Sequence, residues 1–100
     1  PGKAPTALRV ESVTATTITV TWQPLSPLFT NGKLQGYHVI YKKKTADQGV
    51  IENMVSVNAT ILRMTLHGLE PLTTYKIWVA GFTSKGKGPG SKHTEATTLK

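Results

Sequence analysis

Apolar and polar residues alternate strictly over several short stretches of this chain. The clearest is 16–23, where Ile18, Val20 and Trp22 alternate with threonines, and the stretch 75–82 repeats the pattern. Alternation with a period of two predicts a β-strand that buries one face, and β-branched residues favour the same conformation. Less regular patterns predict further strands at 8–13, 37–42, 50–57, 62–66 and 94–98.

The segments between these stretches carry turn-forming residues. The segment 24–36 contains Asn31-Gly32, a strong turn signal, and 84–90 is a glycine-rich loop in which positive backbone φ angles are expected. The sequence has no helical period and no internal repeat. Seven short strands at close spacing predict an all-β, antiparallel sandwich, with a closed barrel as the architectural alternative.

The stretch 66–79 reads as the end of one strand, a corner and the start of the next. Gly68 and Pro71 interrupt the chain, and Tyr75 is the first inward residue after the interruption. This arrangement predicts a tyrosine corner, in which the ring is buried and its hydroxyl bonds to the backbone at 68–72. The inward positions of the strands and corner predict a core of Trp22, Tyr37, Val39, Leu69, Tyr75 and Ile77.

Several spaced motifs follow one another along the chain. They are Ile18-Thr19-Val20-Thr21-Trp22 before Pro24, Asn31-Gly32 before Gly36-Tyr37-x-Val39-x-Tyr41, and Gly68-Leu69-x-Pro71-x-Thr73-x-Tyr75-x-Ile77-x-Val79. Together they resemble the fibronectin type III domain over nearly the whole chain. The resemblance implies a seven-stranded immunoglobulin-like β-sandwich, with strands A, B and E in one sheet and C′, C, F and G in the other. The Asn-Gly and Gly-Tyr motifs also resemble repeats of neuronal cell-adhesion molecules and receptor tyrosine phosphatases.

The chain departs from the family pattern in its last strand. Thr94 and Ala96 stand where the family usually has larger apolar residues, so this strand is expected to be loosely held. The length of 100 residues predicts one domain, which we place at residues 6–100 after a linker at 1–5. The linker-like opening favours a module of a longer chain, because it contains two prolines and a glycine in five residues.

Composition restricts the chemistry that this chain can carry. Cysteine is absent, so disulfides, thiolate metal sites and thiol nucleophiles are excluded. The three histidines and five acids show no catalytic or metal-ligand spacing, which predicts no enzymatic activity, no metal and no cofactor. The sequence contains neither a signal peptide nor an apolar run that would insert into a membrane.

The net charge of +7 points to acidic surfaces or polyanions as partners. Neighbouring loops would bring Lys33, Lys85 and Lys87 to one end, as a possible site for a heparan-sulfate-like chain; no nucleic-acid motif is present. A solvated surface is the simpler interpretation of these lysines. Separately, Asn58-Ala59-Thr60 is an N-glycosylation acceptor sequence in an expected exposed connection, which favours an extracellular setting.

Strand parity predicts what the outer face of the larger sheet presents. If Tyr75 and Ile77 point inward, then Trp78 and Phe82 point outward, and Ile40 on the neighbouring strand lies beside Trp78. An exposed area with these three residues would be a candidate partner-binding surface. The alternative is that Trp78 packs locally over cross-strand neighbours and lysine stems.

These observations favour a non-catalytic module of a multidomain adhesion or receptor protein, acting as a spacer and a protein-binding surface. It would belong to the extracellular part of a single-pass membrane protein and contact neighbouring domains and other proteins. The alternatives are a polyanion-binding module and a cytoplasmic structural repeat, and a secreted protein is a further possible setting.

Overall fold

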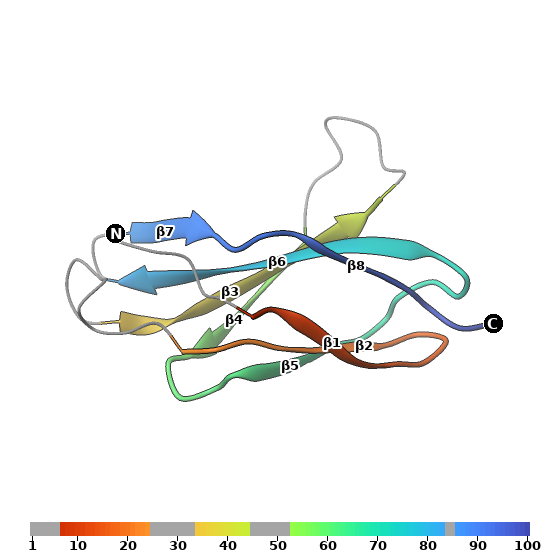
Figure 1. Ribbon diagram of the computed structural model, residues 1–100, viewed down its shortest axis with the longest axis horizontal. Coiled ribbons are helices and arrows are strands. Elements are labelled where there is room, and N and C mark those ends of the chain that lie inside the picture. Colours follow the sequence, from red (N-terminus) through yellow and green to blue (C-terminus); the bar gives the residue numbers. More distant parts are fainter. Residues whose placement is uncertain (1–6, 25–33, 45–52, 84–85) are drawn as a thin grey trace.

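The computed structural model describes residues 7–24, 34–44, 53–83 and 86–100. These segments form a sandwich of two antiparallel sheets, viewed edge-on in Figure 1. Within the described segments, the strands are β1 (Arg9–Val13), β2 (Ile18–Thr21), β3 (Leu34–Lys43), β4 (Asn53–Asn58), β5 (Arg63–Leu66), β6 (Thr74–Thr83), β7 (Gly86–Gly90) and β8 (Thr94–Thr97).

The strand order confirms the predicted topology. The smaller sheet has the order β1-β2-β5, and the larger has the order β4-β3-β6-β7, with β8 also paired to β6. Strands β7 and β8 pair with successive parts of β6, so they form one interrupted strand. The fold is therefore the seven-stranded sandwich, with sheets A-B-E and C′-C-F-G.

The core lies between the sheets and consists of alternate residues from both inner faces. Trp22 is 3% exposed, and its ring meets that of Tyr37 edge-to-face with a centroid distance of 5.5 Å. Burying side chains of this size is the main source of stability in a domain without disulfides. The buried cluster contains all six predicted core residues, Trp22, Tyr37, Val39, Leu69, Tyr75 and Ile77.

Two predicted loops proved to be partly strand. Strand β3 begins at Leu34, inside the predicted loop 24–36, and Gly86–Gly90 forms β7 instead of a hairpin loop. Ladder pairing uses backbone groups only, so a glycine-rich segment can pair without any side-chain pattern. Gly86 does adopt a positive φ, 128°, at the start of β7. No helix in the described segments has the length and hydropathy needed to span a membrane.

Candidate functional site

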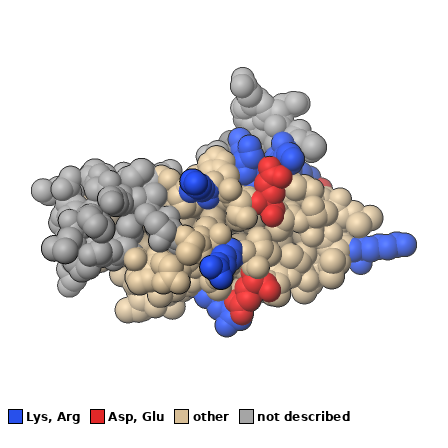
Figure 2. Space-filling model, viewed as in Figure 1, with Lys and Arg blue, Asp and Glu red and all other residues tan. Residues whose placement is uncertain are grey.

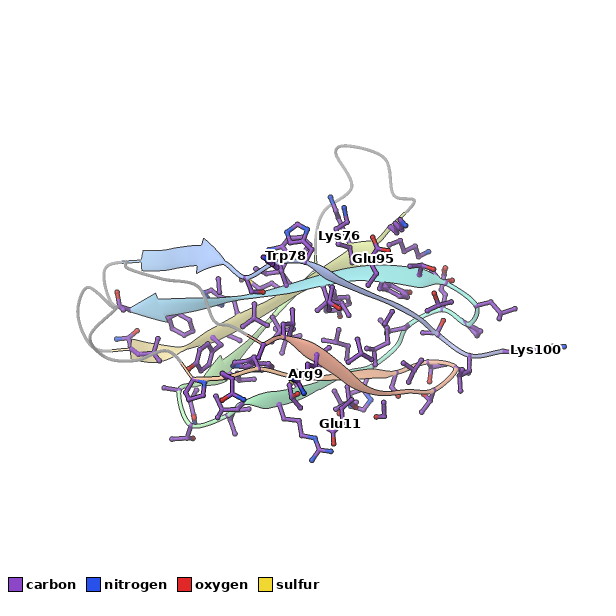
Figure 3. The ribbon with its side chains drawn as sticks, viewed as in Figure 1. Arg9, Glu11, Lys76, Trp78, Glu95 and Lys100 are labelled. Atoms are coloured by element: carbon purple, nitrogen blue, oxygen red, sulfur yellow. The ribbon has the colours of Figure 1, made fainter. Side chains whose placement is uncertain are left out.

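The predicted partner surface on the outer face of the larger sheet is not open. Ile40 lies directly opposite Trp78 in the β3–β6 register, as parity requires, and Figure 3 shows Trp78 pointing away from the smaller sheet. However, Ile40 is only 2% exposed and Trp78 only 8%. The His93 ring stacks on the indole at 4.2 Å, and Gly90 lies against its edge. The prediction of an exposed hydrophobic area was therefore wrong, because the segment joining β7 to β8 covers Trp78.

The third residue of that predicted surface, Phe82, is half-buried in a second stacked pair. The centroid of its ring lies 4.3 Å from the centroid of the His38 ring, and the two rings are inclined by 13°. Opposite Phe82, Gly36 leaves no room for a side chain, since an added Cβ would lie 2.9 Å from the Phe82 ring. His38 Nδ1 is in turn 2.8 Å from Ser56 Oγ. Aromatic stacking therefore fills much of this face.

Ser91 holds the interruption between β7 and β8 against β6. Its backbone N–H donates to the Val79 carbonyl at 2.7 Å, and its hydroxyl accepts the Val79 N–H at 3.0 Å. The hydroxyl thus replaces the carbonyl that a regular ladder would supply, which matters because Val79 is fully buried. The sequence motif Gly86-x-Gly88 before Ser91 is part of the family resemblance, but sequence reasoning assigned Ser91 no hydrogen-bonding role, because strand periodicity does not show which backbone groups a side chain will satisfy.

Among the described residues, three basic side chains are paired with acids. Lys43 pairs with Glu70, and this hydrogen-bonded carboxylate raises the pKa of the Lys43 ammonium above its usual value. Lys44 lies 3.1 Å from Glu95. Figure 2 shows lysine and arginine interspersed with acidic residues on one face. These exposed ion pairs contribute little to stability.

The lysines predicted to bind polyanions cannot be placed by the structure. Lys33 and Lys85 lie outside the described residues, and the side chain of Lys87, in β7, is not described either. Polyanion binding therefore stays a prediction that rests on the net charge of +7.

The histidines are dispersed through the fold. His38 stacks on Phe82, His93 stacks on Trp78, and His67 is exposed beside the corner. Among the described residues, no group of three or more His, Cys, Asp or Glu side chains is placed to hold a metal ion.

The tyrosine corner lies at the end of the sandwich where the described chain finishes. The Tyr75 hydroxyl accepts the Glu70 N–H at 2.9 Å, within the expected range 68–72, and Tyr75 is 4% exposed. The Thr98 hydroxyl donates to the Glu70 carbonyl at 2.5 Å and accepts the Thr73 N–H at 2.9 Å. The corner therefore fixes the final strand as well as its own turn.

Two exposed leucines, Leu72 and Leu99, adjoin this corner, and we call them the corner leucine pair. The Leu72 N–H donates to the Leu99 carbonyl at 3.1 Å, and the Leu99 N–H donates to the Thr14 carbonyl at 3.0 Å. Leu72 is 67% exposed and Leu99 55% exposed. Figure 3 places Lys100, the next residue, at this end of the long axis. The residues after β8 are thus held by backbone hydrogen bonds, and this end of the sandwich exposes an apolar surface.

Asn58 is the last residue of β4 and is exposed, as predicted. Its side-chain Oδ1 accepts hydrogen bonds from Thr60, and its carbonyl accepts the Ile61 N–H at 3.0 Å. The acceptor sequence therefore forms a compact turn that leads from the edge of the larger sheet toward β5.

Comparison with known proteins defines the class to which this sandwich belongs. The fibronectin type III domain family matches residues 3–97. The FN1–FN3 segment of chicken CNTN1 aligns with a TM-score of 0.88 and 28% identity, covering 100% of this chain and 33% of that one. The chain belongs to the fibronectin type III family, a non-catalytic structural fold, which confirms the resemblance inferred from its motifs.

The chain is also similar to short segments of much longer proteins. The MAM and fibronectin type III domain-containing protein 1 of Acropora millepora is 43% identical over 98% of this chain and 23% of its own length. The receptor-type tyrosine-protein phosphatase F of Danio rerio is 37% identical over 99% of this chain and 5% of its own length. The chain therefore spans less than a quarter of these relatives.

Proposed function

We propose that this chain is a non-catalytic module of a multidomain extracellular receptor or adhesion protein, where it acts as a spacer and a contact surface. Its similarity to small parts of much longer proteins supports this assignment, including 5% of a receptor-type phosphatase. The setting we propose is the extracellular part of a single-pass membrane protein. The contact surface is the corner leucine pair, and its partner is the domain that follows along the chain.

The conformation of Leu72 carries this proposal. Leu72 has a φ of 54° while its side chain is 67% exposed. A bulky residue in the left-handed region costs about 1–2 kcal/mol, and glycine or asparagine would avoid that cost. A leucine that is both strained and exposed does not stabilise the isolated module. Burial against a neighbour explains it, since strained backbone is commonly retained at functional positions.

The hydrogen bonds around the leucine pair determine how such a neighbour would be oriented. Thr98 is 2% exposed and is bonded to the corner, and Leu99 is bonded on both sides by its backbone. A domain attached beyond Lys100 would therefore leave in a direction set by the corner. Contact of its surface with Leu72 and Leu99 would restrict it further, as a spacer of defined geometry requires.

The proposal is tested on the segment of the parent chain that contains this module and the following domain. Leu72→Asn with Leu99→Ser removes the apolar surface and keeps a residue that tolerates the left-handed conformation. We expect the single module to unfold at the same midpoint or a higher one, because asparagine relieves the backbone strain at position 72. In the two-domain segment, the double variant should lose amide protection around residues 72 and 99 and show a wider range of inter-domain angles.

The matched control is Met54→Ser. Met54 is 54% exposed on β4, away from the leucine pair, so this change should leave the inter-domain angles as they are. If the double variant behaves as the unchanged segment does, the leucine pair does not contact the next domain. Surface labelling of the intact parent protein on living cells tests the setting separately, and a cytoplasmic structural repeat would remain unlabelled.

Polyanion binding is the alternative function, and the net charge of +7 favours it. Retention on a sulfated-glycan column should then persist to high salt and fall with Lys85→Glu and Lys87→Glu together. Elution at low salt would leave only the weak, screened attraction of a basic surface.

A further inference from the structure

The geometry around Asn58 points to a modification site. We propose that Asn58 carries an N-linked oligosaccharide and that this glycan covers the edge of β4 that faces away from β3. The proposal rests on the extracellular setting proposed above, because this modification occurs on chains that enter the secretory pathway. It concerns a different surface from the leucine pair.

The acceptor residue is presented in an accessible turn. Asn58 and Thr60 are both exposed, and the Asn58 carbonyl accepts the Ile61 N–H at 3.0 Å, which closes a turn that starts at the acceptor. Asparagine is favoured at the first position of such turns. The site therefore lies on the surface, as a bulky solvated modification requires.

The two hydrogen bonds from Thr60 leave the reactive atom of Asn58 available. The Thr60 hydroxyl donates to Asn58 Oδ1 at 2.5 Å, and the Thr60 N–H donates to the same oxygen at 2.9 Å. Both bonds hold the oxygen, and within the described part of the chain Nδ2 makes no hydrogen bond. The threonine of the acceptor sequence thus orients the carboxamide with its nitrogen unused.

The reaction itself is a group transfer from a lipid-diphosphate-linked oligosaccharide. Asn58 Nδ2 forms a bond to the anomeric carbon of the first sugar, while the bond from that carbon to the diphosphate oxygen breaks. The lipid diphosphate leaves with the electron pair, and the amide nitrogen releases one proton to a base of the transferring enzyme. No oxidant or reductant is needed.

The position of Asn58 gives the glycan a structural role. Strand β4 ends the order β4-β3-β6-β7, and its only partner among the described strands is β3. The register places Met54, Ser56 and Asn58 on one face, and Met54 is 54% exposed. An exposed edge strand with an apolar side chain invites pairing with another chain, and natural edges are usually protected. A glycan at the end of β4 would provide that protection.

The first experiment measures occupancy. The full chain is secreted from animal cells behind a heterologous signal peptide, and its intact mass is compared before and after peptide N-glycosidase F. We expect a glycan mass that the enzyme removes, leaving Asp at position 58 in tandem mass spectra. Asn58→Gln and Thr60→Val should lack the glycan, and Thr60→Ser should retain it. Asn53→Gln, an exposed change on the same strand, is the matched control and should remain glycosylated.

A secreted chain with the mass of the bare polypeptide would overturn the proposal. Because the added signal peptide ensures secretion, that result would leave the proposed extracellular function untouched. Conversely, a parent protein found only inside cells would refute the setting, while the occupancy of the secreted chain would still report on the site.

The second experiment tests protection of the edge. Sedimentation velocity of the glycosylated and the enzymatically deglycosylated chain should show a larger associated fraction after deglycosylation. Met54→Lys places a charge on the edge and should return the deglycosylated chain to monomer. Equal association with and without the glycan would overturn the protective role.

Discussion

Removing one hydroxyl group, in Thr98→Val, should destabilise the whole domain. Thr98 is 2% exposed, and its hydroxyl bonds to the Glu70 carbonyl and the Thr73 N–H. Valine keeps the shape and the strand preference, but it leaves both backbone groups without this partner. The change therefore isolates the contribution of hydrogen bonds between the last strand and the corner.

The magnitude follows from the two groups that lose their partner. Each unsatisfied backbone group costs about 1–3 kcal/mol, and the lower half of that range applies because Glu70 is exposed and Thr73 only half-buried. The added methyl group offsets roughly 0.8 kcal/mol. The net loss is therefore about 1–3 kcal/mol, which lowers Tm by roughly 4–24 °C for a domain of this size.

Equilibrium denaturation followed by tryptophan fluorescence measures this loss. The control is Thr97→Val, which removes an exposed hydroxyl bonded to Thr74 at 2.7 Å and should change stability by less than about 0.5 kcal/mol. Tyr75→Phe removes the other bond to Glu70 and should cost about 1–3 kcal/mol. Because both changes act on Glu70, the double variant should show a coupling of at least about 0.5 kcal/mol. A loss for Thr98→Val no larger than the control would refute the reasoning.

Two further substitutions separate the core from the outer face. Trp22→Ala should cost about 3–5 kcal/mol in chemical denaturation, and a loss below about 1 kcal/mol would contradict its central place in the core. Trp78→Ser should cost about 2–4 kcal/mol, less than Trp22→Ala because an exposed His93 ring covers part of the indole. If Trp78→Ser left the unfolding midpoint unchanged and abolished binding to a partner, the outer face of the larger sheet would be an interaction surface after all.

Local pattern was enough to predict the parity of the strands and the tyrosine corner. Alternation assigns Tyr75 inward and Trp78 outward whatever the rest of the chain does, because the side-chain period of a strand is two. The bond from Glu70 N–H to the Tyr75 hydroxyl spans five residues, so its two ends are read from one short motif. The exposed position of Asn58 was likewise predicted from a short local sequence, Asn58-Ala59-Thr60.

Burial and long-range bonding were decided only by the tertiary structure. Trp78 points outward but is buried, because Gly90 at the end of β7 and His93 before β8 lie against its indole ring. Side-chain periodicity did not predict the position of this segment. The Thr98 bond to Glu70 spans 28 residues and depends on the register between β6 and β8, which side-chain periodicity does not specify. Glycine-rich β7 carries no periodic signal, because its pairing uses the backbone alone. A period of two determines which face a residue takes, and only the folded chain determines what lies against that face.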